Sequence, residues 1–254
     1  MSMRWPAETV WEQVVPLLPG FTVEVLPEID SSNTELMRRA RAGQVEPTLL
    51  VAEHQSAGRG RMGRDWLGSP GATLTFSLGM LLAPQDWSGL SLAVGLSVAQ
   101  SLDARLQIKW PNDLWLDGRK LCGILIETAS VGGSRYAVIG IGINILPRSA
   151  EGLRTAPAAL VECLPGIDAP AALQRVVLPL VQAIQTFCAN GFAPLRDAYA
   201  ARCALRGQTV VCTDGTTGFC QSVDASGALL VHTSAGVKKI SSAEVSVRPD
   251  SAAP

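Results

Sequence analysis

The sequence contains little histidine, few aromatic residues and almost no net charge. Only 2 of its 254 residues are histidine, aromatic residues make up 5%, and the formal net charge is −1 at pH 7. Domains that bind along nucleic acid usually carry a strong basic excess. The balanced charge therefore argues against a dedicated nucleic-acid binder, so any anion site must depend on local positive charge.

The cysteines lack the spacings of a metal site or a disulfide framework. They lie at positions 122, 163, 188, 203, 212 and 220, with no C-x-x-C pair, and His54 and His232 are not at ligand spacing from them. Residues 1–20 contain no unbroken apolar run, because Arg4, Glu8 and Glu12 interrupt it. We therefore expect reduced thiols in a cytoplasmic protein without a membrane span.

Two basic motifs stand out in the sequence. GRGRMGRDW at 58–66 places Arg59, Arg61 and Arg64 among glycines, and KWPND at 109–113 begins with Lys109. Arginines separated by glycines let guanidinium groups and backbone N–H groups converge on one anion. A residue before proline favours extended backbone, so Lys109 and Trp110 should face opposite sides of a strand. A buried Lys109 then needs an anionic or carbonyl partner, which predicts a polyanion site.

The arginine loop also permits other interpretations. It matches G-x-G-x-x-G, but a dinucleotide fold requires a helix at this point, whereas the residues here lead into a strand at 72–78. Arginine-glycine segments that bind RNA are usually longer disordered repeats. A solvated surface loop remains an alternative, and Asn112 and Asp113 fit either turn residues or ligand contacts.

The hydrophobic patterns predict an α+β fold with a mixed, mainly antiparallel sheet backed by helices. Strands are expected at 21–26, 48–53, 72–78, 120–128 and 136–145, and helices at 32–42, 90–102 and 171–190. Ser32 and Glu35 have capping-box spacing at the first of these helices. After Gly207 the chain changes to short strands with D-G and S-G turns. We expect a catalytic domain at 1–206 and a small all-β domain at 207–254.

Several motifs in one order resemble the catalytic domain of biotin protein ligases. They are DSSN at 30–33, EHQSAGRGRMGRDW at 53–66, KWPNDL at 109–114, KLCGILIE at 120–127 and GIGIN at 140–144. The resemblance covers about residues 21–250. It implies a class II synthetase-like domain followed by an SH3-like β-barrel. It also implies that biotin reacts with ATP to give biotinyl-5′-AMP and pyrophosphate, and that a lysine of an acceptor protein then displaces AMP.

The resemblance also implies roles for individual residues. The residues expected to bind biotin are Ser31, Ser32, Asn33, Gln55, Arg59, Gly60, Arg61, Lys109 and Gly123, of which Lys109 and Arg61 would act in catalysis. The ATP or adenylate side would use Arg59, Arg61, Arg64, Lys120 and Asn144, with Trp66 supporting the closed loop and Arg248 contributing from the barrel. Mg²⁺ is expected with ATP, but no metal ligand is assigned.

Two departures from the family pattern affect these expectations. About twenty residues precede Phe21, so the chain resembles the short, enzyme-only form without a DNA-binding helix-turn-helix. Where a bacterial member stacks an aromatic residue on adenine, this chain has Ala158, Ala159 and Leu160.

The expected partner is biotin carboxyl carrier protein, the acetyl-CoA carboxylase subunit, with no DNA and no membrane, and a homodimer remains open. The rivals are a lipoate ligase or octanoyl transferase, and a protein that only binds biotin or its adenylate.

Overall fold

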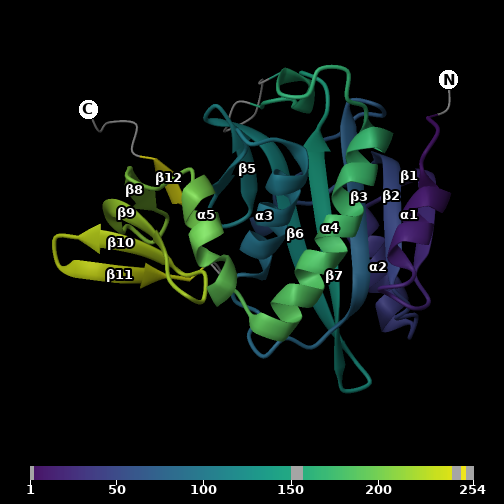
Figure 1. Ribbon diagram of the computed structural model, residues 1–254, viewed down its shortest axis with the longest axis horizontal. Helices are drawn as coiled ribbons and strands as arrows, with labels where there is room; N and C mark the ends of the chain where they lie inside the picture. Colours follow the sequence, from purple (N-terminus) through teal and green to yellow (C-terminus); the bar gives the residue numbers. More distant parts are fainter. Residues whose placement is uncertain (1–2, 150–156, 242–246, 250–254) are drawn as a thin grey trace.

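A computed structural model describes residues 3–149, 157–241 and 247–249, which form two β-sheets with helices around the larger one (Figure 1). The larger sheet has the strand order β1-β2-β3-β7-β6-β5-β4. Its strands are β1 (Thr22–Ile29), β2 (Thr48–Gln55), β3 (Thr73–Leu82), β4 (Gln107–Lys109), β5 (Asp113–Leu116), β6 (Arg119–Val131) and β7 (Ser134–Asn144). Only β1 and β2 pair in parallel, and the other neighbours are antiparallel. The predicted mixed, mainly antiparallel sheet is confirmed.

Alternation along the strands separates the two faces of this sheet. On β7, Ile139, Ile141 and Ile143 enter the main core, which also holds the buried sides of α1 (Ala7–Val14), α3 (Leu90–Leu102) and α4 (Ala169–Asn190). Tyr136 and Val138, on the opposite face, join a smaller cluster under α2 (Ser32–Arg41). Side chains two residues apart share a face of a strand, so this division follows from the sequence pattern.

On the face that carries α2, β7 changes from large side chains to none. Tyr136 and Val138 are followed by Gly140 and Gly142 at the same two-residue spacing. β3 presents Thr73, Thr75 and Ser77 to this face, since Leu74, Phe76 and Leu78 point into the main core. The missing and short side chains leave space above the sheet beyond the end of α2.

The longest helix, α4, is long and apolar enough to cross a membrane. Its buried residues include Val176, Leu180 and Ile184, and it packs on α3 and α1. Buried core helices can have the same length and apolar composition, so its packing here explains its apolar sequence.

The N-terminus of α2 differs from the prediction by one residue. Ser31, not Ser32, is the cap, and its hydroxyl accepts a hydrogen bond from the Thr34 N–H at 3.4 Å. The Ser32 hydroxyl instead lies 3.0 Å from Gln55 Oε1 and 2.7 Å from Ser77 Oγ. Ser32, which the sequence pattern assigned to capping, therefore uses its hydroxyl for hydrogen bonds to residues of β2 and β3.

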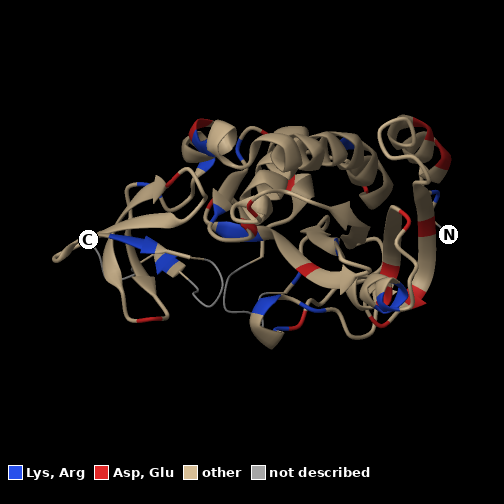
Figure 2. Cartoon of the chain, turned by 90° about the horizontal axis from the view of Figure 1, so that it is seen from below, with Lys and Arg blue, Asp and Glu red and all other residues tan. Residues whose placement is uncertain are grey.

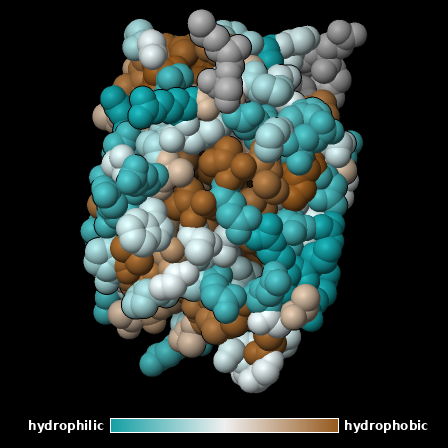
Figure 3. All heavy atoms as spheres, turned by 90° about the vertical axis from the view of Figure 1, so that its right-hand side faces the viewer, coloured by the Kyte–Doolittle hydropathy of each residue, from teal (hydrophilic) through white to brown (hydrophobic). Residues whose placement is uncertain are grey.

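The β1 edge of the sheet is protected from pairing with other strands. β1 carries Glu24 and Glu28 around Pro27, and charge and proline on an edge strand oppose edge-to-edge association. Figure 3 views this end, where hydrophobic residues are interspersed with hydrophilic ones. Glu24 also binds Arg39 of α2 through two hydrogen bonds of 2.7 and 3.0 Å.

The C-terminal strands form a second antiparallel sheet of order β11-β10-β9-β8-β12. They are β8 (Thr209–Cys212), β9 (Thr217–Val223), β10 (Leu229–Thr233), β11 (Gly236–Ile240) and β12 (Val247–Pro249), and α5 (Arg196–Arg202) precedes them. Among the described residues β11 and β12 do not pair, and 242–246 between them lie outside the described chain. A closed barrel and a boundary at 206 stay predictions.

A turn of the second sheet contacts the KWPND segment. The Trp110 indole Nε1 donates a 3.1 Å hydrogen bond to the Gly227 carbonyl, and Trp110 is fully buried. A Cβ added at Gly227 would lie 2.9 Å from Gly89 Cα, at the start of α3. The C-terminal sheet is therefore packed tightly against the segment that carries Lys109.

Gly227→Ala is expected to lower the free energy of unfolding by about 2 kcal/mol, because it combines positive-φ strain with overpacking. Gly227 has φ +85°, and Gly215, with φ +82°, has nothing within 4 Å of an added Cβ. Gly215→Ala therefore shares the backbone strain but not the contact. Urea denaturation of both variants isolates the contact, and equal losses would show that this turn does not hold the two sheets together.

Candidate active site

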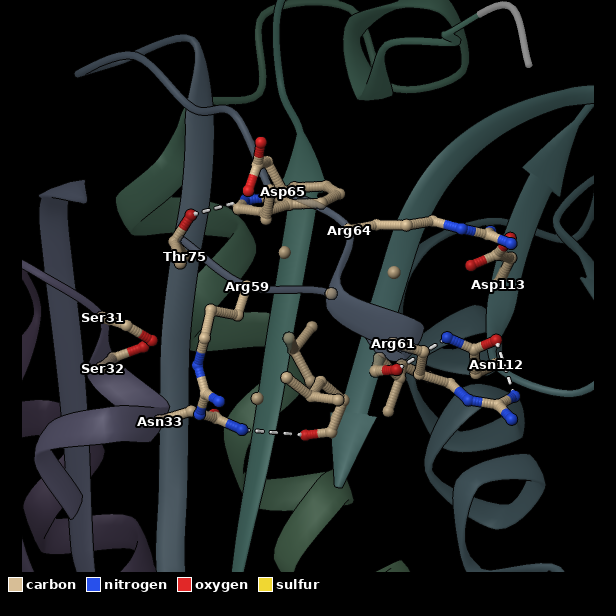
Figure 4. Close-up of a pocket in the computed structure, with 18 of the residues that line it drawn as sticks. Ser31, Ser32, Asn33, Arg59, Arg61, Arg64, Asp65, Thr75, Asn112 and Asp113 are labelled. Atoms are coloured by element: carbon tan, nitrogen blue, oxygen red, sulfur yellow. Dashed lines mark hydrogen bonds between the residues drawn. The ribbon is translucent and has the colours of Figure 1, made fainter. Parts of the chain in front are cut away.

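One pocket above the glycine-bearing face collects residues that lie far apart in the sequence. Its lining includes the N-terminus of α2, the arginine loop, the KWPND segment and residues of β2, β3, β6 and β7. Ser31 and Ser32 point into it from one side, and Asn112 and Asp113 lie across from them (Figure 4). The arginine loop and Lys109 thus meet at a single cavity, as predicted.

The end of the pocket near α2 is a network of hydroxyl and amide groups. Ser77 Oγ donates to Asn33 Oδ1 at 2.6 Å, and Ser77 Oγ is 2.7 Å from Ser32 Oγ. The Ser32 N–H donates to Gln55 Oε1 at 2.7 Å. Ser32, Asn33 and Ser77 are all buried. Buried hydroxyl and amide groups that satisfy one another form a rigid surface able to recognise a neutral polar ligand.

The arginine loop is a small closed hairpin over the pocket. Trp66 N–H donates to the Gly58 carbonyl at 2.8 Å, and Gly60 N–H donates to the Arg64 carbonyl at 2.7 Å. Between these bonds lies a 3₁₀ turn at Arg61–Gly63. The backbone holds three arginines on one short segment, which continues into a strand and not into a helix. The dinucleotide interpretation is thereby excluded.

Trp66 anchors this loop on the sheet. Its indole lies over Gly142, where an added Cβ would come within 2.3 Å of Cε2 and Cζ2. Nε1 donates to Thr75 Oγ1 at 3.3 Å, and the Arg148 guanidinium lies 5.5 Å from the ring centroid. Gly123 pairs with Gly142 across β6 and β7. The two glycines provide the space that the indole needs.

Gly142→Ala is expected to raise the hydrogen-exchange rate of the Gly60 and Trp66 amides by roughly tenfold, because displacing the indole loosens the hairpin by about 1.4 kcal/mol. Gly123→Ala is the matched control, since its Cβ would meet Trp66 Cζ3 only at 3.4 Å, and its nearest neighbour would be the end of the flexible Lys120 side chain at 3.3 Å. Hydrogen–deuterium exchange measured by mass spectrometry compares the two. Identical exchange in both variants would remove Trp66 as the loop anchor.

The opposite end of the pocket is cationic. Its charged lining contains Arg61, Arg64, Lys109 and Lys120 against Asp65 and Asp113, whereas Arg59 of the same loop extends toward Asn33 (Figure 4). The chain as a whole has a net charge of −1. In the view of Figure 2, Lys and Arg occur in short separate segments among Asp and Glu. The local excess distinguishes this pocket from the rest of the surface and suits an anionic ligand.

Lys109 lies among other cations at this end. Its side chain is 9% exposed, and burial lowers its pKa to about 8, although the Asp113 carboxylate raises it. Lys120, Arg64 and Arg248 lower that pKa further by repulsion. Lys120 Nζ lies 2.7 Å from Asp113 Oδ1, and Arg64 extends toward the same carboxylate (Figure 4). An ammonium ion in this position gains strongly from a bound anion.

Anion binding in the pocket is expected to weaken above about pH 8, where Lys109 loses its proton. Stability should move the other way, because the unfolded chain keeps this proton until its pKa of 10.5 is reached. Between these values the unfolded state binds more protons, so rising pH favours the fold through this group. Phosphate binding and unfolding measured over the same pH range distinguish the two effects. Parallel losses would assign the pH effect to denaturation.

Most of the residues predicted for the site line the pocket. They are Ser31, Ser32, Asn33, Gln55, Arg59, Gly60, Arg61, Arg64, Lys109, Lys120 and Gly123. Asn144 is not among the lining residues, and its buried amide Nδ2 donates to the carbonyls of Lys120 and Ala158. Ala158, Ala159 and Leu160 are buried and also outside the lining. Any contact between these three residues and the adenine of ATP stays a prediction.

Sequence reasoning missed Ser77, Gly140 and Glu127 as parts of the site. Ser77 and its neighbours Thr73 and Thr75 alternate with apolar residues in β3, and all three are buried. Polar residues at every second position of a strand buried on both faces are a usable signal for a lined cavity. Glu127 ends the KLCGILIE motif, but nothing in the sequence indicates that its carboxylate accepts a hydrogen bond from Asn33.

Comparison with known proteins agrees with this geometry. Residues 25–144 match the Biotin/lipoate A/B protein ligase family. The biotin–[acetyl-CoA-carboxylase] ligase of Paracoccus denitrificans is 35% identical over 250 residues, covering 87% of this chain and 98% of the relative. The bifunctional ligase/repressor BirA of Escherichia coli is 33% identical over 250 residues, covering 93% of this chain and 77% of the relative.

The fold matches a solved structure in the same family. Biotin protein ligase from Aquifex aeolicus, in complex with biotin and ATP, superposes with a TM-score of 0.77 at 29% identity, covering 90% of this chain and 99% of that one. Sequence, fold and the convergence of the predicted residues on one pocket lead to the same assignment. The chain belongs to the biotin protein ligases of the biotin/lipoate A/B protein ligase family and is a biotin ligase.

Proposed function

We propose that the enzyme converts biotin and ATP into biotinyl-5′-AMP and transfers the biotinyl group to one lysine of a biotin carboxyl carrier protein. The observation that carries this proposal is a single pocket with a neutral hydrogen-bonding end and a cationic end. The Aquifex relative holds biotin and ATP, and the Paracoccus relative is named for acetyl-CoA carboxylase. The free cysteines support a cytoplasmic location.

The neutral end suits the ureido ring of biotin. The Ser31 hydroxyl accepts from Thr34 N–H, so its own proton is available to a ligand carbonyl. Asn33 Oδ1 has a second lone pair beyond the one that Ser77 uses, which suits a ligand N–H. Gln55 fixes the Ser32 backbone beside them. A cyclic urea offers the matching acceptor and donors.

The cationic end suits the reacting groups. Adenylation brings the biotin carboxylate onto the α-phosphorus of ATP, so two anions must approach each other. Lys109, Arg61 and Arg64 would offset their repulsion and stabilise the charge that develops on the phosphoryl oxygens. Carboxylate oxygen bonds to phosphorus as pyrophosphate leaves. In the second step the acceptor amine attacks the acyl carbon, loses a proton, and AMP leaves.

Mg²⁺ fits this pocket as an ion that arrives with the nucleotide. The described residues contain no group of three or more His, Cys, Asp or Glu side chains that could hold a metal. Mg²⁺ commonly uses one or two carboxylates together with substrate phosphates and water. Asp113 would supply the carboxylate, and the ion would neutralise phosphate charge.

The test is pyrophosphate release on mixing the purified chain with biotin, ATP and Mg²⁺, followed by transfer to a purified carrier domain. We expect release with biotin and one biotinyl group per carrier. Faster turnover of lipoate or octanoate than of biotin would identify a lipoate ligase or an octanoyl transferase. Binding of biotin without any pyrophosphate would identify a binding protein, and either result would contradict the proposal.

A further inference from the structure

Glu127 joins the arginine loop to the neutral end of the pocket. Arg59 Nη2 donates to Glu127 Oε1 at 2.9 Å and to Oε2 at 2.8 Å. Asn33 Nδ2 donates to the same Oε2 at 2.9 Å. One carboxylate on β6 therefore accepts from a loop residue and from a buried residue of α2. In Figure 4 the Arg59 side chain descends from the loop toward Asn33.

This contact decides which way the Asn33 amide points. A carboxylate can only accept hydrogen bonds, so Asn33 must turn its NH₂ group toward Glu127 and the Leu125 carbonyl, which lies 3.3 Å away. Its carbonyl oxygen then faces Ser77, which donates to it. Without Glu127, the amide could rotate and reverse the donor and acceptor that it presents in the pocket.

The same contacts make a closed ring with the loop. From Asn33 the network continues through Ser77 and Ser32 to Gln55, and Gln55 stands three residues before Gly58, where the loop hairpin begins. Glu127 closes the ring by holding Arg59. The N-terminal side of the arginine loop is thus tied at two points, Gln55 and Arg59, to the residues that would surround the biotin ring.

We propose that Glu127 is a positioning residue that sets the Asn33 amide for biotin and holds the arginine loop over the pocket through Arg59. The inference rests on the proposed function for the identity of the ligand. Glu127 touches neither the cationic end nor the reacting atoms. Its effect passes through Arg59 for adenylate retention and through Asn33 for biotin affinity.

Two substitutions separate these effects. In Glu127→Gln the amide oxygen can still accept from Asn33, but the charge that holds Arg59 is lost. We expect biotin affinity within about threefold of wild type and release of bound biotinyl-adenylate roughly fivefold faster. Glu127→Ala also removes the shorter of the two hydrogen bonds that orient the Asn33 NH₂, leaving only the Leu125 carbonyl, so biotin should bind roughly tenfold more weakly. Calorimetry gives the biotin affinity, and filter retention of labelled adenylate gives the release rate.

Glu24→Gln is the matched control, because Glu24 also accepts two hydrogen bonds from one arginine and lies at the β1 edge. It should match wild type in both measurements. In an Arg59→Ala background, Glu127→Gln should have no further effect on adenylate release. A full additional effect in that background would overturn the role through Arg59.

Limited trypsin digestion tests the loop without any ligand. The loop offers cleavage after Arg59, Arg61 and Arg64, and Glu127→Gln should speed cleavage there roughly fivefold relative to wild type and Glu24→Gln. If wild type makes no adenylate, the proposed function fails, while digestion still decides the role of Glu127. Equal digestion of all three proteins would contradict the inference even if ligation is normal.

Discussion

Lys109→Met is expected to slow biotinyl-adenylate formation by about 10²–10³-fold, the range for removing one preorganised charge from a reacting phosphoryl or acyl group. Met keeps a similar length and volume but carries no charge. Burial and the nearby cations already lower the pKa of Lys109 to about 8. Removing its charge from the folded chain should therefore leave stability unchanged or higher.

The measurement is single-turnover formation of labelled adenylate, combined with denaturation of the same samples. Lys238→Met is the control, because Lys238 pairs with Asp214 and Thr216 on the second sheet, away from the pocket. A variant of Lys109 that is folded, stable and inactive would assign the loss to charge. Adenylate formation within threefold of wild type would place the reacting atoms elsewhere.

The sequence predicts the parts of this site that are local in the chain. A glycine-separated arginine run and a lysine before Trp-Pro are visible without a structure. Hydrophobic spacing also predicts the two strands that flank the arginine run and the helix at 90–102 that precedes the KWPND segment. The same reasoning placed the cap of α2 on Ser32, where the structure has Ser31. That error arises because Ser32 has long-range partners, Gln55 and Ser77, that outweigh local capping.

The parts that could not be predicted depend on strand register. Gly123 faces Gly142 and both lie under Trp66, but nothing near any of these residues in the sequence specifies that pairing. Glu127 meets Arg59 across 68 residues and Asn33 across 94. Such contacts arise only when β6 pairs with β7 in one register, because a shift by one residue would turn Glu127 to the opposite face.

Arg61→Gly is expected to keep adenylate formation measurable but to release the intermediate about 10- to 100-fold faster, since two contributions of about 1 kcal/mol each are lost. Arg61 starts the 3₁₀ turn of the loop and lines the pocket, and its Nη1 donates to Asn112 Oδ1 at 3.4 Å. Burial lowers the pKa of its guanidinium, so this charge lies in a partly desolvated position. The side chain therefore connects the loop to Asn112 of the KWPND segment at the pocket.

Arg61→Gln distinguishes these two contributions. It removes the charge without the backbone freedom that glycine adds, so its release rate should fall between those of wild type and Arg61→Gly. Labelled adenylate, isolated on each protein and followed after dilution, gives the rates directly. If both variants retain it as long as wild type, the loop does not cover the intermediate. If only Arg61→Gly releases the adenylate faster than wild type, the stiffness of the loop backbone retains the adenylate. The guanidinium is then dispensable, and the hairpin closed by the Trp66 and Gly60 hydrogen bonds is sufficient.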